Sequence, residues 1–373
     1  MVSDVEGGTG LDAATVVQRD GTVSLQDVTI LARPGELLAV LGPSGSGKST
    51  LLRAIAGLAK LRSGRVLIAG EPTRLDPAYR DLAMVFERTQ LMPLLDVARN
   101  MGFGLASRRM PPTEVERRVA DQSRRLRVSK LLRRMPHQLS SGEQGQVGIG
   151  RALVRTPKAF LLDEPLAHVD PQERARMRRV IAETVRATKV STLYVTHDQS
   201  DALAIGDRIA VLKAGRLVQI ATPRDLYDRP ADLFVADFVG VSPIGALPGR
   251  LMASSGMAGY RVGDRTLPTW RPVPAELREH VNRDVVLGLR AEHVTPADAG
   301  ANPDGVRLTG RVRAIGRNGR DAFLTLDVAG ARLVARFPGR TAATIGDLVT
   351  VTADATRAHV FDRSGRALYH PPA

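Results

Sequence analysis

The chain contains no cysteine, and Phe, Trp and Tyr together account for only 4% of its 373 residues. Without cysteine it cannot form disulfides, thiolate metal sites or a cysteine nucleophile, a composition that suits the cytosol. Long hydrophobic runs are also missing, because none reaches the roughly 18 apolar residues that a membrane-spanning helix needs. Residues Met1 to Gly10 hold acidic residues and glycines where a signal peptide has a basic end and an apolar core, so we expect no signal peptide.

The charge balance is basic, with 53 Lys and Arg against 39 Asp and Glu and a net charge of +14. Such a charge permits nucleotides, nucleic acid or an anionic membrane face as partners. Much of the excess lies in arginine-rich segments, namely Arg117-Arg118, Arg124-Arg125 and Arg174 to Arg179. Since aromatic residues that stack on bases are scarce, we interpret these segments as solvated helix faces and expect no nucleic-acid partner.

Length and pattern predict two domains, because 373 residues with 43% hydrophobic content can bury a core in each. Residues 1–240 alternate apolar strand patterns with helix patterns, which is typical of an α/β fold with a parallel sheet covered on both faces. Residues 248–373 give short β runs broken by glycine and proline, which predict a small all-β barrel or barrel pair. We expect the boundary at 241–248.

Local patterns place the elements of both domains. Residues about 88–140 are rich in Arg, Met and Pro, and the spacing of Val115, Val119 and Leu126 predicts a helical insertion. The strands predicted in the first domain are two within Thr15–Arg33, one at Arg65–Gly70 after a turn at Ser63-Gly64, and others at Ala83–Phe86, Ala159–Leu162, Thr192–Thr196 and Ile209–Leu212. Those predicted in the second domain are 285–289, 310–315, 322–328, 333–335 and 348–351.

One stretch fits the phosphate-loop pattern G-x4-G-K-[ST] in full: Gly42-Pro43-Ser44-Gly45-Ser46-Gly47-Lys48-Ser49-Thr50. An apolar strand pattern at Leu37–Leu41 precedes it and a helical pattern at Leu51–Leu58 follows, as the motif requires. The glycines let the loop fold back, so that backbone N–H groups and the positive end of the helix surround the phosphates of a nucleotide. We expect Lys48 to reach the β- and γ-phosphates and the hydroxyl of Ser49 to ligate Mg²⁺.

A second candidate element is Leu161-Leu162-Asp163-Glu164, an apolar strand that ends in two acids. Asp163 suits a Mg²⁺ contact, and Glu164 suits polarising the water that attacks the γ-phosphate. Alone, such a pair can equally be two solvated carboxylates. Its weight comes from Leu139-Ser140-Ser141-Gly142-Glu143 upstream and Val195-Thr196-His197-Asp198 downstream. In this order the motifs resemble the ATP-binding-cassette (ABC) ATPases, with a signature sequence, a Walker B pair and a switch histidine.

The resemblance narrows to the ATPase subunits of bacterial carbohydrate importers, of which the maltose importer's is the best known. It covers about residues 15 to 370 and implies a phosphate-loop ATPase domain with a helical insertion, followed by an OB-like β regulatory domain. The segments that carry it are Pro165–Asp170, His197-Asp198-Gln199, Lys213–Arg216 and Asp228–Ala231 in the first part, and Gly288–His293 and His359–Asp362 in the tail.

The family implies a head-to-tail homodimer with two ATP sites. Each site would pair residues 42–50 of one subunit with Ser140, Ser141 and Gly142 of the other, so that ATP closes the interface and hydrolysis reopens it. His197 would contact the γ-phosphate, and Asp170 would couple the two sites. The helical insertion would receive two transmembrane permease subunits at the cytoplasmic face of the membrane, with an extracytoplasmic substrate-binding protein on the other side.

The chain departs from the family pattern at several positions. Arg19 stands where an aromatic residue usually stacks on adenine, and we expect its guanidinium to stack there by a cation–π contact. Glu87 replaces a glutamine that links Mg²⁺ to the permease interface, and we expect it to be a Mg²⁺ ligand. The signature reads Ser-Ser-Gly-Glu and is followed by Gln144-Gly145-Gln146, and His168-Val169 replaces a common Asn-Leu pair.

The leading hypothesis is an ATP hydrolase that drives import of a sugar, polyol or related solute. A polyamine or an inorganic anion is an alternative solute. A soluble ABC protein that acts on nucleic acid or ribosomes is another alternative, although such proteins usually carry two fused cassettes. A subunit that regulates without turnover is a further one, against which the intact Lys48, Ser49, Asp163, Glu164 and His197 argue. The solute itself is chosen by other proteins.

Overall fold

The computed structural model describes residues 7–88, 90–240, 242–254, 257–263, 265–268, 270, 272–297 and 306–372. Met1–Glu6, which include most of the segment behind the signal-peptide expectation, and Val241 of the expected boundary lie outside these residues. The chain forms two compact units, Met1–Pro223 and Arg224–Ala373. Among the described residues, no helix has both the length and the apolar character of a membrane span.

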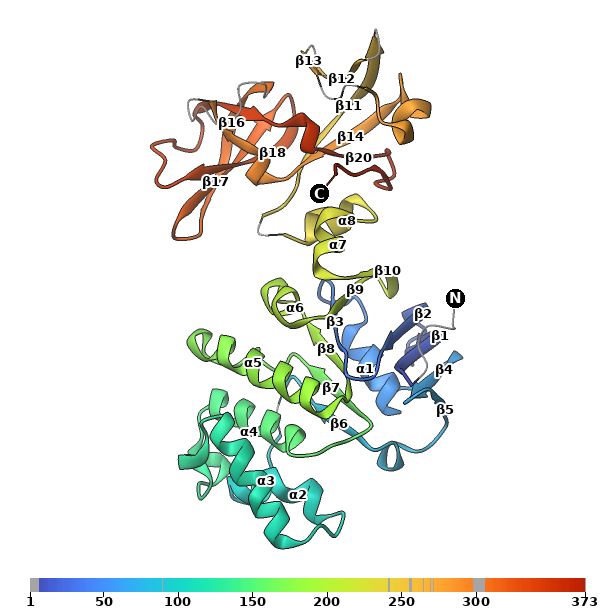
Figure 1. Cartoon of the computed structure of the whole chain (residues 1–373), viewed down its shortest axis with the longest axis vertical. Coiled ribbons are helices and arrows are strands. Elements are labelled where there is room, and N and C mark those ends of the chain that lie inside the picture. Colours follow the sequence, from blue (N-terminus) through green and yellow to red (C-terminus); the bar gives the residue numbers. More distant parts are fainter. Residues whose placement is uncertain are drawn as a thin grey trace. The chain divides into compact units, whose positions relative to one another are not determined.

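A six-stranded sheet forms the centre of the first unit (Figure 1), in the order β10-β9-β3-β8-β7-β6. Its strands are β3 (Leu37–Leu41), β6 (Leu82–Val85), β7 (Ala159–Asp163), β8 (Ser191–Thr196), β9 (Arg208–Lys213) and β10 (Arg216–Ala221). All pairs are parallel except that of β9 with the edge strand β10, which is antiparallel. The strand β10 was not predicted from the sequence. Every residue of β3, β7 and β8 is buried, as expected where helices cover both faces. The parallel α/β prediction is therefore confirmed.

A second, antiparallel sheet has the order β2-β1-β4-β5. It contains β1 (Thr9–Val17), β2 (Val23–Ala32), β4 (Ser63–Ile68) and β5 (Glu71–Thr73). The turn predicted at Ser63-Gly64 was wrong, because Ser63 pairs with Thr15 of β1 and so belongs to β4. The chain turns instead at Ala69-Gly70, where both residues have positive φ (51° and 84°). The turn at Ala69-Gly70 therefore joins β4 and β5 into an antiparallel hairpin, and Gly70 adopts its positive φ readily.

Helices complete the first unit. α1 (Lys48–Ala56), α5 (Pro171–Thr188) and α6 (Gln199–Ile205) belong to the α/β part, and α2 (Val97–Ala106), α3 (Pro112–Arg125) and α4 (Ser141–Leu153) lie together in the green region of Figure 1. Short 3-10 turns occur at Pro77–Tyr79, Ser129–Leu131 and Pro136–Gln138. The apolar side chains Met101, Val119, Leu126 and Val147 share one buried core, which confirms the predicted helical insertion. The helices pack closely at Gly150, where a Cβ would lie 2.8 Å from Cε of Met101 and 3.0 Å from Cδ1 of Leu126.

The second unit is an antiparallel β structure that follows two short helices, α7 (Pro223–Asp228) and α8 (Leu233–Phe238). Its main strand order is β15-β19-β16-β17-β18-β11-β14-β20-β21, and β12 pairs with β11 and β13. These strands are β11 (Gly245–Ser254), β12 (Met257–Val262), β13 (Arg265–Pro268), β14 (Asp284–Leu289), β15 (Val294–Pro296), β16 (Val306–Arg317), β17 (Asp321–Val328), β18 (Ala331–Pro338), β19 (Leu348–Ala353), β20 (His359–Phe361) and β21 (Ala367–Tyr369). Further 3-10 turns lie at Ala275–His280, Ala291–His293 and Ala355–Arg357. The all-β prediction is confirmed.

The unit boundary differs from the one expected at 241–248. Arg290, which is 2% exposed, donates from Nη1 to the carbonyl oxygens of Ala236 and Val239, both at 2.7 Å, and from Nη2 to that of Tyr227 at 2.9 Å. Its guanidinium also stacks 4.1 Å from the centre of the Tyr227 ring. Because these contacts tie α7 and α8 to the β structure, the division falls after Pro223.

Candidate functional site

The phosphate loop joins β3 to α1, and its glycines are required by its geometry. Gly45 and Gly47 have φ of 77° and 99°, a region that other residues rarely adopt. At Gly42 a Cβ would lie 2.3 Å from the carbonyl oxygen of Leu212, and at Gly47 it would lie 2.5 Å from that of Ser24. Only glycine therefore lets the loop pass so close to β9 and β2.

The first turn of α1 offers free donors above this loop. Gly47 is the N-cap, and no side chain caps the helix. The first backbone N–H groups of a helix have no partner within it, and the helix dipole favours an anion there. The hydroxyl of Ser46 is also buried without a partner. These donors fit the phosphates of a nucleotide.

Lys48 lies folded into the loop and is 8% exposed. Its Nζ donates to the carbonyl oxygens of Gly42 at 2.8 Å and Pro43 at 2.9 Å. Burial lowers the pKa of Lys48, and the nearby carboxylates of Glu164 and Asp163 oppose that shift. A compact cation with only two neutral acceptors has the capacity to bind phosphate oxygens as well.

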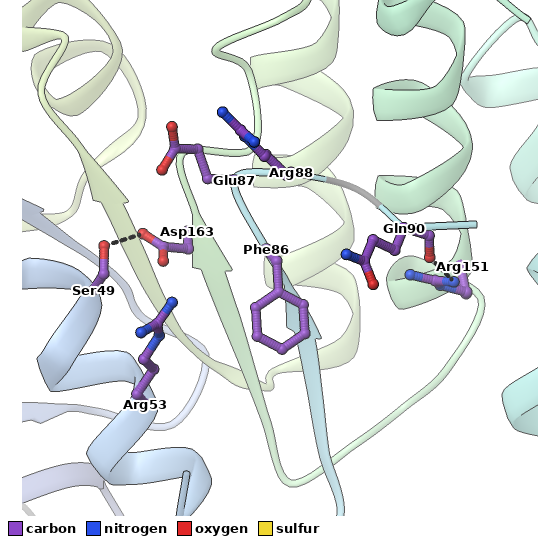
Figure 2. Close-up of a pocket in the computed structure, with 8 residues that line it drawn as sticks. All are labelled: Ser49, Arg53, Phe86, Glu87, Arg88, Gln90, Arg151 and Asp163. Atoms are coloured by element: carbon purple, nitrogen blue, oxygen red, sulfur yellow. Dashed lines mark hydrogen bonds between the residues drawn. The ribbon is translucent and has the colours of Figure 1, made fainter. Parts of the chain in front are cut away.

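Ser49 and Asp163 meet next to the loop, where Figure 2 shows them joined. The Ser49 hydroxyl donates to Oδ1 of Asp163 at 3.1 Å. Burial raises the pKa of Asp163, the Ser49 bond opposes that shift, and the charges of Glu164 and Glu87 add to it. Arg53, which extends from α1 toward Asp163 in Figure 2, partly offsets the repulsion. A buried carboxylate that crowds other carboxylates favours a cation beside it.

These side chains line a cavity of about 490 Å³. Its other lining residues come from the end of β6 and from α4: Phe86, Glu87, Arg88, Gln90 and Arg151. Glu87 is exposed, and it reaches the same cavity as Ser49 and Asp163. Within the described residues, no group of three or more His, Cys, Asp or Glu could hold a metal ion. The hydroxyl and two carboxylates are nevertheless oxygen ligands of the kind that Mg²⁺ uses together with phosphates and water.

Glu164 and His197, two further predicted site residues, lie in contact with each other. Oε1 of Glu164 lies 2.7 Å from Nδ1 of His197. The Glu164 side chain is 13% exposed and that of His197 is 66% exposed, so the histidine opens to solvent while the carboxylate lies deeper. Glu164 has a φ of 47°, an uncommon conformation for a residue with a long side chain. Its N–H donates to the carbonyl oxygen of Val195 at 3.0 Å, which fixes the end of β7 against β8.

Ser140, Ser141 and Gly142 begin α4. Ser140 is the N-cap: its hydroxyl accepts from the N–H of Glu143 at 3.2 Å, and Oε2 of Glu143 accepts from the N–H of Ser140 at 2.8 Å. This reciprocal capping box explains how the Ser-Ser-Gly-Glu variant starts the helix, since a glutamate side chain accepts this bond as a glutamine would. Ser140 and Ser141 are exposed, so the helix start faces solvent in the single chain.

Comparison with known proteins places this geometry in a family. Residues 25–167 match the family model described as "ABC transporter", and residues 287–361 match that of the "TOBE domain". The chain is 42% identical over 338 residues to the sn-glycerol-3-phosphate import ATP-binding protein UgpC of Cereibacter sphaeroides, covering 90% of this chain and 92% of that protein. The chain belongs to the ABC transporter ATPases.

Other relatives extend this result. The protein of the same name from Ralstonia nicotianae is 40% identical, with 88% of this chain and 89% of that protein covered. A solved dimeric structure of a post-hydrolysis state of the ATP-binding cassette MJ0796, bound to ADP and Pi, matches with a TM-score of 0.54 and 29% identity. It covers 57% of this chain and 98% of that one. This ABC ATPase is thus an ATP-hydrolysing importer subunit of the carbohydrate-importer type, which confirms the predicted family and enzyme class and disfavours the soluble, non-transport alternative.

Arg19 lies in the exposed turn between β1 and β2. The strand that follows this turn lies close to the phosphate loop, since a Cβ at Gly47 would lie 2.5 Å from the carbonyl oxygen of Ser24. The N–H of Gln26 donates to the carbonyl oxygen of Gly215 at 2.8 Å, and the N–H of Gly215 donates to that of Ser46 at 3.1 Å. The turn therefore precedes a strand that is anchored beside the phosphate loop. The contact of Arg19 with adenine stays a prediction.

Sequence reasoning misread part of the arginine-rich segment 174–179. Arg174, Arg176 and Arg178 bond across to other elements of the first unit, whereas Arg117 pairs with its own helix neighbours Glu114 and Asp121. The spacing of charges along a helix does not tell which face packs against a neighbour, so the solvated-face interpretation was wrong for these three. Arg53 was also missed, although it lies only three residues after the phosphate loop.

Proposed function

We propose that this ABC ATPase works as a homodimer at the cytoplasmic face of the membrane, where it binds two Mg²⁺–ATP and drives two permease subunits. The observation that supports this best is the convergence of Lys48, the Ser49–Asp163 pair and the Glu164–His197 pair at the ends of β3, β7 and β8. Ligands of parallel sheets bind at the carboxyl ends of the strands. The chemistry of these five side chains suits transfer of a phosphoryl group to water.

Each residue has a role in this proposal. Lys48 and the N–H groups of α1 bind the β- and γ-phosphates, while Ser49, Asp163 and Glu87 hold Mg²⁺, which neutralises phosphate charge when bound. Glu164 orients and polarises the attacking water. His197 contacts the γ-phosphate side of the site and, through its bond to Glu164, keeps that carboxylate in place.

The second subunit completes each site. Ser140, Ser141 and Gly142 of the partner contribute a hydroxyl and the N-terminus of α4 to the γ-phosphate. Two features support this arrangement: the exposed start of α4 and the dimeric state named for a structural relative. Because ATP presents a γ-phosphate and ADP does not, ATP stabilises the closed dimer.

For the solute, we propose sn-glycerol 3-phosphate or a closely related polyol or sugar, delivered by an extracytoplasmic binding protein. The support is that the relatives covering about nine tenths of the chain carry that name. Uptake of labelled sn-glycerol 3-phosphate should disappear when the gene is deleted and return with the intact gene. Normal uptake of that solute, with loss of polyamine or inorganic-anion uptake, would instead identify the alternative solute.

The Glu164→Gln variant tests the catalytic assignment. The amide cannot accept a proton, so we expect ATP binding to persist, hydrolysis to fall by about 100-fold or more, and a dimer to accumulate with Mg²⁺–ATP. Hydrolysis rate and light-scattering mass would be measured side by side. Glu183→Gln, which removes a charge from an exposed ion pair on α5, serves as the control for loss of a charge outside the site. Wild-type turnover by a monomeric Glu164→Gln chain would reject both the water-activating role and the dimer.

A further inference from the structure

Arg174 lies in the first turn of α5 and bonds to two different segments of the catalytic site. Its Nε donates to the carbonyl oxygen of Val169 at 3.2 Å and its Nη2 to that of Ala167 at 3.4 Å. Its Nη1 donates to Oδ2 of Asp198 at 3.1 Å. The side chains of Arg174 and Asp198 are each 30% exposed, so the contact is half-buried. All three nitrogens of this planar group are in use.

Two of these contacts, to Ala167 and to Asp198, each lead to one member of the Glu164–His197 pair. The N–H of Ala167 donates to the carbonyl oxygen of Glu164 at 3.1 Å, so the segment that Arg174 holds is bonded to Glu164 itself. On the other side, Asp198 is the next residue after His197 and caps α6 through the N–H groups of Ser200 and Asp201. The 2.7 Å contact between Glu164 and His197 therefore closes a loop of interactions that passes through Arg174.

Glu164 needs such support, because its φ of 47° is unfavourable for a residue with a Cβ. Strained backbone persists at a functional site only where the surroundings hold it. The turn 164–169 has few bonds of its own: Val169 donates to Leu166 at 3.1 Å, and Ala167 donates to Glu164. Arg174 adds two further bonds to this turn from a regular helix.

We propose that Arg174 is a positioning residue that holds Glu164 and His197 at bonding distance by bridging Ala167 and Asp198. This rests on the proposed function, in which these two side chains act on the water and the γ-phosphate. Arg174 touches neither of them, so it affects turnover only through their geometry. A lysine at this position has one ammonium in place of a three-nitrogen fork and cannot hold both segments in the same way.

Arg178, one turn further along α5, provides a matched control. Its Nη1 donates to the carbonyl oxygen of Ser200 at 3.2 Å and to Oδ1 of Asp201 at 3.0 Å. It therefore links α5 to α6 as Arg174 does, but the described contacts of its side chain do not include the turn 164–169. If α5–α6 packing is what matters, substitutions of Arg174 and of Arg178 should both reduce kcat. If the bridge between Ala167 and Asp198 matters, only the substitution of Arg174 should reduce it.

The experiment measures kcat and KM for ATP, and the midpoint of thermal unfolding, for Arg174→Ala, Arg174→Lys and Arg178→Gln. A small misplacement of catalytic groups can reduce rates by roughly 10- to 100-fold. We expect a kcat loss of that size for Arg174→Ala with KM changed less than about twofold, because no phosphate contact is removed. Arg174→Lys should recover part of kcat, and Arg178→Gln should keep it.

A double-mutant cycle with Asp198→Asn gives a readout that a purely structural role would not move. If Arg174 acts through Asp198, the fold-loss of kcat in the double mutant is smaller than the product of the two single fold-losses, whereas independent effects multiply. Wild-type kcat in Arg174→Ala, equal losses in Arg174→Ala and Arg178→Gln, or multiplicative losses in the cycle would each overturn the proposal. If Glu164→Gln retains full turnover, the proposed function fails first; if only the Arg174 series fails, the catalytic assignment stands without the bridge.

Discussion

Glu87 is the residue that we propose as a third Mg²⁺ ligand, beside Ser49 and Asp163. It lines the cavity that contains Ser49 and Asp163, and its charge contributes to raising the pKa of Asp163, after the larger effect of burial. Two unit charges about 4 Å apart repel by roughly 4 kcal/mol at an effective dielectric near 20, so Glu87 opposes a γ-phosphate unless a cation lies between them. A hard divalent cation prefers anionic oxygen ligands, which makes Mg²⁺ the natural neutralising group.

We expect Glu87→Gln to flatten the dependence of ATP hydrolysis on free Mg²⁺ while leaving the thermal midpoint unchanged. The measurement is the hydrolysis rate across a free Mg²⁺ series for both forms. Gln90→Glu, a charge added on the same cavity wall beside Arg151, serves as the control for a general charge effect. Superimposable curves for the Glu87→Gln variant and the parent would reject the metal-ligand role of Glu87.

The short helices α7 and α8 depend on one buried arginine. Burial lowers the pKa of Arg290 to about 10, and the carboxylates of Asp228 and Asp237 oppose the shift. Even so, the group stays charged at neutral pH and binds the carbonyl oxygens at the ends of both helices. Removing it takes a donor away from three carbonyl groups, and each lost bond costs about 1–3 kcal/mol where water cannot replace it.

We expect Arg290→Ala to lower the free energy of unfolding of the second unit by roughly 3 kcal/mol or more. Urea unfolding can be followed by the fluorescence of Trp270, the only tryptophan, which is 7% exposed and packs edge-on against Tyr369. Arg332→Ala is the matched control, because its ion pair with Asp237 of α8 is exposed and such pairs contribute about 1 kcal/mol or less. Equal effects of the two substitutions would contradict the anchoring role of Arg290.

The division after Pro223 makes a prediction about the chain as two units. All proposed site residues, from Arg19 to His197, lie within residues 1–223, and the edge strand β10 ends at Ala221. We expect a chain that ends at Pro223 to remain soluble and to bind ATP as the full chain does.

A chain that ends at Pro248 retains α7 and α8 without Arg290 and should be less soluble. A fluorescent ATP analogue measures binding, with Lys48→Ala in the shorter chain as the control. A soluble 1–223 chain that does not bind ATP would contradict the division of function.

The second unit should also lose stability in mild acid. Burial lowers the pKa of His359 to about 3, and the positive charge of Arg290 and the neighbouring His370 and His293 add to the shift. Nδ1 of His359 lies 3.0 Å from Nδ1 of His370. At pH values between about 3 and 6.5, His359 binds a proton in the unfolded chain but not in the folded chain. Stability is therefore full above the unfolded pKa and is lost as the pH falls.

Each such histidine contributes a slope of at most about 1.4 kcal/mol per pH unit. The pKa values of His370 and His293 are also lowered, mainly by burial, so their contributions have the same sign. We expect the unfolding free energy from Trp270 fluorescence to decrease between pH 7 and pH 5, before most carboxylates titrate. His359→Gln should reduce that slope. A slope that is the same in the parent and the variant would contradict the burial effect.

Local patterns in the sequence were sufficient for the features that depend on neighbouring residues. A phosphate loop needs particular residues at consecutive positions, so Gly42–Thr50 could be recognised directly, and the ordered motifs around Asp163 and His197 identified the family. Apolar runs predicted β3, β7 and β8 because strands buried on both faces consist largely of apolar residues. The all-β character of the second unit followed from its short runs and frequent turns in the same way.

Tertiary structure decided what depends on residues far apart in the chain. The turn at Ser63-Gly64 was mispredicted because pairing of Ser63 with Thr15 extends β4, and the unit boundary moved because Arg290 binds carbonyls some fifty residues earlier. Arg174 was read as a solvated charge, yet it bridges Ala167 and Asp198. A pattern of residue types records the chemistry available at each position, whereas which donor meets which acceptor is determined only when the sheet brings distant segments together.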